Sequence, residues 1–288
     1  MKKIGFIDYY IDEWHANNYP NWIHESRFAK EFEIALAWEE MTPPDRIPLA
    51  EWCKREGVGK AESIEQVVAE CDALVVLSPD NAERHEDLAD LPLRSGKPVY
   101  IDKPIAPSLA AAQRLFAKAT AHGTPMMSSS ALRFGSQIEG ALAGDLAGQK
   151  VTSVITEGPG VFHIYVIHQI EMLVMTLGIG AKAVMQYGND AVKQMAVRYD
   201  DGRSATVTLH PSMDFRLFAA YGEDKSVNLT GMGDFFPRFI DRMLEFFNTR
   251  LAPIDPRQTL EIAALIEAGV AALETPNVWV PVPEIKAI

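Results

Sequence analysis

Short apolar runs alternate with helical patterns through the first part of the chain. The runs predict buried strands, and the amphipathic stretches between them predict helices. We expect strands at residues 3–8, 32–38, 73–77 and 99–101, and helices at residues 12–28, 49–56, 63–70, 82–91 and 109–122. Strands that alternate with helices form right-handed βαβ units around a parallel sheet. The pattern therefore predicts a Rossmann-like domain over residues 1–128.

The pattern changes after Arg133. Longer strands with partial alternation follow one another, and Asp200-Asp201-Gly202 supplies a hairpin turn between two of them. We expect strands at residues 151–156, 183–187, 192–199 and 204–209, a helix at 162–178, and amphipathic helices at 237–248 and 259–273 covering one face of their sheet. The chain is therefore predicted to be α/β, with a second domain over residues 129–288 built on a large, mostly antiparallel open sheet.

Charged residues follow the buried strand at 99–101. The segment reads Asp102-Lys103-Pro104, and Ser108 is suited to cap the next helix. The carboxyl ends of strands in an open α/β sheet face the ligand crevice, so Lys103 is expected to point into it. An ammonium there can position a substrate hydroxyl or carbonyl, and partial burial lowers its pKa. The alternative is a surface lysine that happens to follow a strand.

The expected helix at 162–178 carries a second group of chemically useful side chains. Tyr165, His168 and Glu171 recur at intervals of three and lie on or near one face. A carboxylate beside an imidazole can orient it and raise its proton affinity, which suits general acid-base catalysis. A histidine satisfied at a domain interface is the alternative.

Composition narrows the class of protein. The chain has 288 residues, of which 48% are hydrophobic, and its formal charge of -12 argues against a nucleic-acid partner. We find no apolar run long enough to span a membrane and no signal peptide, so we expect a cytoplasmic protein. Cys53 and Cys71 are expected to be reduced and structural, and the histidines form no chelating pattern, so no catalytic metal is expected.

Four short segments resemble motifs of the Gfo/Idh/MocA family of NAD(P)-dependent oxidoreductases. Their order and spacing follow the family along nearly the whole chain. They are Asp102-Lys103-Pro104, similar to the family's Glu-Lys-Pro; Leu77-Ser78-Pro79-Asp80 with His85, similar to Thr-Pro-Asn and a later His; Ala131-Leu132-Arg133-Phe134, similar to Tyr-Arg-Phe; and His168 with Glu171, similar to His-x-x-Asp/Glu.

The resemblance implies hydride transfer between a nicotinamide and a hydroxyl-bearing carbon of a sugar, polyol or cyclitol derivative. It also implies a homodimer or higher homo-oligomer that pairs through the C-terminal sheet. It assigns the catalytic roles to Lys103 and His168, with Glu171 orienting the histidine. An acidic residue that many members carry before the histidine is replaced here by Ile164.

The implied substrate-binding residues are Arg133, His163, Tyr165 and His168, although Arg133 is equally well explained by a domain-junction ion pair. The implied cofactor-binding residues are Asp8, Tyr10, Ile11, Glu39, Ser78, Pro79, His85, Asp102 and Lys103.

The loop after the first strand departs from this family. A dinucleotide fold usually has Gly-x-Gly-x-x-Gly there, whereas this chain has Asp8, Tyr10, Asp12 and Glu13 in the loop. These acids would repel a pyrophosphate unless they point away, for example with Asp12 capping the next helix. An acid after the second strand, Glu39 or Glu40, favours NAD over NADP. The alternative is a non-catalytic, sugar-like ligand-binding or regulatory protein that has lost the dinucleotide.

Overall fold

The computed structural model of the chain describes residues 1–286; residues 287–288, at the end of the predicted second domain, lie outside the described part. It divides into two units. Unit 1 contains Met1–Ser129 and Pro237–Ile254, and unit 2 contains Ser130–Phe236 and residues 255–286. The sequence predicts two contiguous domains that meet at residues 128 and 129. The structure differs in that the segment Pro237–Ile254 returns to unit 1.

Unit 1 is built on a parallel sheet of six strands, as predicted. The strand order is β3-β2-β1-β4-β5-β6. β1 and β4, which are short apolar runs in the sequence, pair with each other at the buried centre of the sheet. The two strands at the edges of the sheet, β3 and β6, were not expected. The strands are β1 (Lys2–Asp8), β2 (Phe32–Glu39), β3 (Gly59–Lys60), β4 (Ala73–Val76), β5 (Val99–Ile101) and β6 (Met126–Met127).

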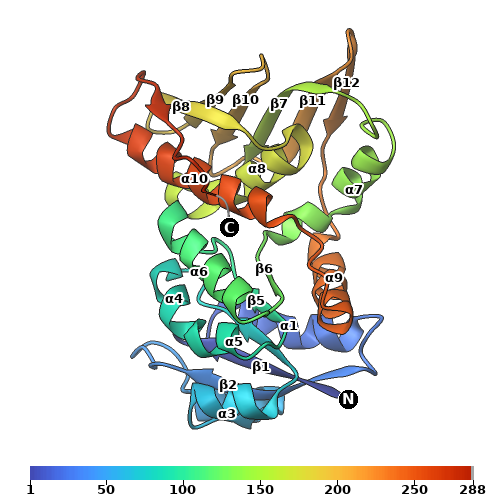
Figure 1. The fold of residues 1–288 in the computed structure, drawn as a ribbon, viewed down its shortest axis with the longest axis vertical. Helices are drawn as coiled ribbons and strands as arrows, with labels where there is room; N and C mark the ends of the chain where they lie inside the picture. Colours follow the sequence, from blue (N-terminus) through green and yellow to red (C-terminus); the bar gives the residue numbers. More distant parts are fainter. Residues whose placement is uncertain (287–288) are drawn as a thin grey trace. The chain divides into compact units, whose positions relative to one another are not determined.

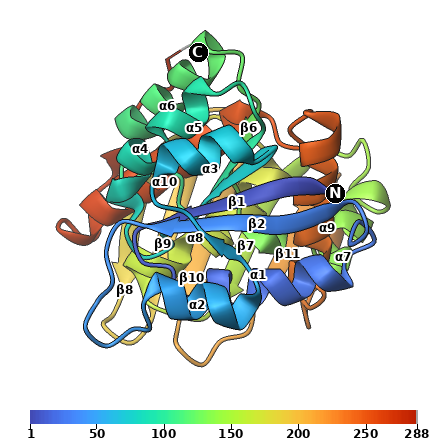
Figure 2. The same cartoon turned by 90° about the horizontal axis from the view of Figure 1, so that it is seen from below.

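Helices cover both faces of this sheet. Figure 2 shows α1 and α2 on one face and α3, α5 and α6 on the other. The helix expected at residues 82–91 is divided into three short pieces. Pro92, in the third piece, has no N–H to donate to the Leu88 carbonyl, which interrupts the backbone bonding between the second and third pieces. The helical elements are α1 (Trp14–Glu25), α2 (Leu49–Glu56), α3 (Ile64–Glu70), η1 (Ala82–Arg84), α4 (His85–Leu88), α5 (Asp90–Arg94) and α6 (Leu109–Ala121).

Gly5 explains how α3 approaches β1 so closely. A Cβ at this position would lie 2.3 Å from Val67 Cγ1 and 3.0 Å from Cys71 Sγ. Only glycine therefore fits under the end of α3.

Helix α9 (Phe235–Thr249) packs on unit 1 rather than on the C-terminal sheet. The prediction that residues 237–248 form a helix is confirmed, but the prediction that this helix covers the C-terminal sheet is wrong. The Phe239 ring centroid lies 5.9 Å from that of Tyr19 and 5.2 Å from that of Tyr100. Phe247 lies 6.3 Å from Phe32 in the same way. An amphipathic pattern shows which face of a helix is apolar but not which sheet buries that face.

Unit 2 contains a mostly antiparallel sheet of seven strands, as predicted (Figure 1). The order is β12-β11-β7-β10-β9-β8-β13, and β7 with β10 forms the one parallel pair recorded among the described strands of this sheet. β11, β12 and β13 were not expected, nor was the helix α7 (Ser136–Ala143). The strands are β7 (Val151–Gly158), β8 (Ala181–Gly188), β9 (Lys193–Tyr199), β10 (Ser204–Leu209), β11 (Arg216–Tyr221), β12 (Lys225–Leu229) and β13 (Val280–Pro281).

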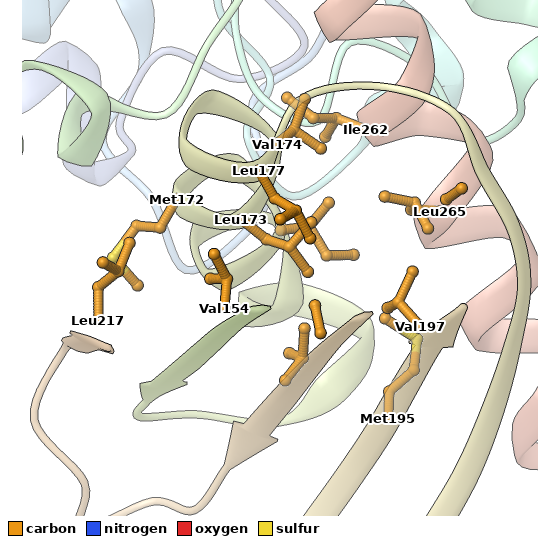
Figure 3. Packing of buried hydrophobic residues seen from close by; sticks show 14 of the residues in the cluster. Val154, Met172, Leu173, Val174, Leu177, Met195, Val197, Leu217, Ile262 and Leu265 are labelled. Carbon is orange, nitrogen blue, oxygen red and sulfur yellow. The ribbon is translucent and has the colours of Figure 1, made fainter. Parts of the chain in front are cut away.

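Helices α8 (Phe162–Leu177) and α10 (Pro256–Leu273) pack against one face of this sheet. Figure 3 shows Leu173 of α8 and Leu265 of α10 gathered with Val154 and Val197 of the strands, and all four are almost fully buried. Burial of such a side chain contributes about 1.5–3 kcal/mol relative to exposure. α8 is therefore held rigidly along its buried face, which fixes the direction of its polar side chains.

Candidate functional site

The predicted site residues fall on both units. Lys103 and the predicted cofactor-binding residues lie in unit 1, whereas His168, Glu171 and Arg133 lie in unit 2. Each set is described within its own unit.

In unit 1, three neighbouring parallel strands end at polar residues. β1 ends at Asp8, β4 is followed by Leu77 and Ser78, and β5 is followed by Asp102. Because β1 pairs with β4 and β4 with β5, the polar residues Asp8, Ser78 and Asp102 share one edge of the sheet. All three are at least 98% buried. This edge is where a doubly wound sheet places its ligand.

Asp102 is held as a buried carboxylate. Tyr100 donates its hydroxyl to Asp102 Oδ1 at 2.8 Å, and His15 Nδ1 lies 3.2 Å from Oδ2. Burial alone would raise the pKa of Asp102, but the charges of His15 and of the half-buried Lys103 lower it below its ordinary value. Asp102 and Lys103 thus form a charged pair of neighbours at the strand end.

The first helix is capped by Glu13, not by Asp12. The Glu13 carboxylate accepts from the backbone N–H of His15 at 2.7 Å and from that of Ala16 at 2.5 Å, and Glu13 is 2% exposed. Asp12 instead accepts from Asn17 Nδ2 at 2.9 Å and from the backbone N–H of Ile47 at 3.2 Å. The prediction of an Asp12 cap is therefore wrong.

Asp8 is a third buried acid beside Glu13 and Asp102. Its Oδ1 accepts from the backbone N–H of Tyr9 at 2.7 Å, and its Oδ2 has no hydrogen-bond partner. Burial, followed by the charges of Glu13 and Asp102, raises the pKa of Asp8 well above its ordinary value. With Glu13 on the first turn of α1 and Asp8 beside it, the residues present do not fit a pyrophosphate at the usual place for a dinucleotide.

The remaining loop residues predicted to bind the cofactor also have partners within the protein. Glu39 accepts from the backbone N–H of Ile11 at 3.0 Å and from that of Leu49 at 2.9 Å. Tyr10 donates to Asp80 at 3.3 Å. The acid expected to bind a ribose thus holds the loop after β1 to the start of α2.

The segment after β4 is similarly occupied. Ser78 is buried, has a φ of 76° and donates its hydroxyl to the Asn81 carbonyl at 3.2 Å, while Pro79 is half-buried. His85 is fully buried, with Nδ1 3.0 Å from the Ile105 carbonyl and Nε2 2.7 Å from the Leu77 carbonyl. Burial lowers the pKa of His85. The structure therefore shows His85 bound to backbone on both ring nitrogens.

In unit 2, α8 holds His168 next to a serine. The Ser130 hydroxyl lies 2.7 Å from His168 Nδ1, and the imidazole packs edge-on against the rings of Tyr165 and Phe215, with centroids 5.5 and 5.6 Å away. Ser130 also accepts from the backbone N–H of Leu132 and so caps a short helix, η2 (Ala131–Phe134). A serine directly before a short helix is a capping signal that sequence reasoning did not use.

Glu171 is bound to other groups than the sequence predicts. It is 1% exposed, accepts from the backbone N–H of Ser130 at 3.2 Å, and forms an ion pair with Arg133. Arg133 also donates to Gln258 at 2.8 Å and is 8% exposed. Arg133 thus forms the buried ion pair that the sequence left open as the alternative to substrate contact. Glu171 accepts from the backbone of Ser130, and the Ser130 side chain contacts His168. Any effect of Glu171 on the orientation of the His168 ring therefore passes through Ser130.

The first turn of α8 is exposed. His163 is exposed, and Tyr165 is 40% and Ile164 54% exposed. Ile164, at the position where many relatives are expected to have an acid, offers no group for proton transfer.

Two kinds of feature are not found in the described part of the chain. Residues 1–286 contain no group of three or more histidine, cysteine, aspartate or glutamate side chains arranged to hold a metal ion. Within the same residues, no helix has both the length and the apolar content needed to cross a membrane.

Comparison with known proteins finds a family model that matches part of the chain. Residues 15–129 match the model of the Gfo/Idh/MocA oxidoreductase family with an NAD-binding Rossmann fold. A search by sequence found no match among curated proteins. The match covers unit 1 from the first turn of α1 through β6, including Asp102-Lys103-Pro104.

Solved structures share the fold of the whole chain at low sequence identity. Myo-inositol dehydrogenase from Lactobacillus casei, in complex with NAD(H) and myo-inositol, has a TM-score of 0.82 and 12% identity, covering 100% of this chain and 98% of that one. The WlbA dehydrogenase from Bordetella pertussis, in complex with NADH and UDP-GlcNAcA, has a TM-score of 0.75 and 14% identity over 99% and 100% of the two chains. An NAD-binding oxidoreductase from Klebsiella pneumoniae has a TM-score of 0.74 and 14% identity over 99% of each chain.

The resemblance seen in the sequence motifs is thereby confirmed over residues 15–129, which match the Gfo/Idh/MocA oxidoreductase model, and the whole chain shares the fold of these solved dehydrogenases. The family binds NAD(P). At these identities the solved structures establish the fold alone.

Proposed function

We propose that this protein is an NAD(P)-dependent oxidoreductase that transfers hydride between the nicotinamide and a hydroxyl-bearing carbon of a sugar, polyol or cyclitol derivative. The family match over residues 15–129, which includes Asp102-Lys103-Pro104, carries this proposal. The bound ligands of two structural relatives, myo-inositol and UDP-GlcNAcA, support the substrate class. We favour NAD over NADP because the charge of Glu39 at the end of β2, although its oxygens accept from backbone N–H groups, would repel a 2′-phosphate.

Lys103 and His168 handle the proton of the reacting hydroxyl in this proposal. The charge of Lys103 helps to keep its neighbour Asp102 ionised, since opposite charges nearby favour ionisation. Ser130 holds His168 Nδ1 and so directs Nε2 away from η2. An imidazole held in one orientation is a suitable general acid or base near neutral pH.

Two further properties belong to the proposal. We place the protein in the cytoplasm, where buried, unpaired cysteines such as Cys53 and Cys71 stay reduced. We also propose a homo-oligomer that pairs through the sheet of unit 2, because Ile155 and Phe218 lie side by side across β7 and β11 and Ile155 is 38% exposed. Light scattering of the purified chain gives its mass and tests the oligomer directly.

A second function is favoured by one observation. Glu13 bonds to the N–H groups that a pyrophosphate would use, which suits a non-catalytic protein that binds a sugar-like ligand without the dinucleotide.

Calorimetric titration with NAD, NADH, NADP and NADPH, followed by a dehydrogenase screen over sugars and cyclitols, separates the two functions. Micromolar binding, about -8 kcal/mol, together with turnover supports the oxidoreductase.

Lys103→Ala and His168→Ala should each abolish turnover and keep the fold. Lys60→Ala and His24→Ala, which remove the same side-chain types from exposed positions, are the matched controls. Full turnover in both site variants would refute the assigned roles.

A further inference from the structure

The first turn of α1 offers two backbone donors to an anion, and the chain fills both itself. The N–H groups of His15 and Ala16 point to the Glu13 carboxylate at 2.7 and 2.5 Å. In a dinucleotide-binding fold, the N-terminus of the helix after the first strand is where the pyrophosphate binds, because free N–H groups and the helix dipole meet there. A carboxylate and a phosphate oxygen therefore require the same two donors.

Glu13 is firmly held in this position. It is 2% exposed, and its Oε2 also lies 3.3 Å from His15 Nδ1. Charge-assisted hydrogen bonds from two amides are among the stronger ones in proteins. An incoming phosphate would have to displace a buried side chain whose hydrogen bonds are already made.

The surroundings add repulsion to this competition. The unpaired Oδ2 of Asp8 is buried at the end of β1, and Asp102 lies at the end of β5 on the same edge. Three acids thus stand together where a second anion would enter. Farther along the loop, the N–H of Ile11 is bound to Glu39 as well.

We propose that Glu13 is an internal competitor for the dinucleotide, whose carboxylate occupies the pyrophosphate position of α1 and must leave it before a dinucleotide binds. The proposal deepens the proposed function, on which it rests for the identity of the ligand. It assigns to Glu13 the control of dinucleotide affinity, a role that no sequence motif indicated.

The test is calorimetric titration of the full chain with NAD, with NADH and with inorganic pyrophosphate. Glu13→Ser removes the charge and keeps a hydroxyl that can cap α1, so the helix is retained. We expect this variant to bind NAD and pyrophosphate at least about tenfold more tightly than the wild type, because two donors are released. Glu13→Gln, which keeps the length of the side chain without its charge, should show a smaller gain and serves if Glu13→Ser does not fold.

Asp12→Asn is the matched control. It removes one negative charge from the same loop, but Asp12 bonds to Asn17 and Ile47 rather than to the start of α1. Its affinity for NAD should stay within about twofold of the wild type, since it releases no donor at α1. An equal gain in Asp12→Asn and Glu13→Ser, or no gain in folded Glu13 variants, would overturn the proposal.

Binding and turnover separate this inference from the proposed function. If Glu13→Ser binds NAD more tightly but oxidises no sugar or cyclitol, the internal competitor stands and the oxidoreductase fails. If the wild type turns over substrate and Glu13→Ser binds NAD no better, the oxidoreductase stands and the competitor fails.

Discussion

Replacing Asp8 by asparagine removes a buried charge from the end of β1. In the wild type, Oδ1 accepts from the backbone N–H of Tyr9, and Oδ2 has no partner. Asparagine can keep the first bond with its carbonyl oxygen, and its amide can donate toward the carboxylates of Glu13 and Asp102. The substitution therefore removes an unsatisfied acceptor without removing the hydrogen bond that is made.

The effect on stability should depend on pH with a definite sign. The folded pKa of Asp8 is raised above its unfolded value by burial and by Glu13, so the folded state binds the proton more tightly. Stability from this group is then greatest below the unfolded pKa and declines as the pH rises toward the folded pKa. Asparagine does not titrate, so the free energy of unfolding of Asp8→Asn should be close to that of the wild type near pH 4. It should exceed the wild-type value by an amount that grows up to pH 8.

The expected gain at pH 8 is about 1–3 kcal/mol, the usual cost of one buried polar atom without a partner. Urea unfolding followed by tryptophan fluorescence measures it in unit 1, which holds Trp14, Trp22, Trp38 and Trp52. Melting temperature should rise by about 2–4 °C per kcal/mol.

Asp45→Asn, at an exposed aspartate, is the control for lost charge and should change stability by less than about 0.5 kcal/mol. If Asp8→Asn loses stability equally at pH 5 and pH 8, the account of Asp8 as a costly buried acid is wrong.

Three other substitutions test the packing and the site of unit 2. Glu171→Ala leaves Arg133 buried without its ion-pair partner and should lower the free energy of unfolding by about 3–5 kcal/mol in urea titrations; a loss below about 1 kcal/mol would contradict the ion pair's importance. Ser130→Ala removes the hydroxyl that contacts His168 Nδ1 and, on the proposed function, should lower kcat about tenfold with little change in KM, which is a fraction of the full general acid-base contribution. Steady-state kinetics with unchanged kcat would exclude this positioning role. Leu173→Ala opens a cavity under α8 and should cost about 2–5 kcal/mol, and a loss as small as that of a surface substitution would show that the core there repacks.

Local pattern was enough to predict most of unit 1. The strands β1, β2, β4 and β5 lie close to their expected positions, because a buried parallel strand needs a continuous apolar run. The capping role of Ser108 was also expected from local sequence, because serine directly before a helix is a preferred N-cap residue. In the structure, Ser108 accepts from the backbone N–H of Ala111. Short strands such as β6 and β13 were missed because two residues are too few to show a hydrophobic periodicity.

The site was only partly predictable. Asp102, Lys103 and His168 were found because charged or titratable residues follow a strand or recur along a helix. The sequence did not show that Glu13 rather than Asp12 caps α1, since aspartate is a preferred N-cap residue and glutamate is not, and the outcome depends on where the chain turns after β1. It also did not show that Arg133 pairs with Glu171, a contact between residues far apart in the chain.

By itself, the sequence determined the class of fold, the motifs that resemble the family, and the acidic replacement of the glycine loop, because periodicity, turn residues and residue type are local properties. Tertiary structure alone decided that α9 joins unit 1, that Ser130 rather than Glu171 contacts the Nδ1 atom of His168, and that Glu13 takes the donors of α1. The first two outcomes depend on surfaces and side chains that meet across long stretches of chain, and the free energy of burial and hydrogen bonding between such distant partners cannot be read from neighbours in sequence. The third is a local contact, but the choice of Glu13 depends on the turn after β1, where Asp12 accepts from the distant backbone N–H of Ile47.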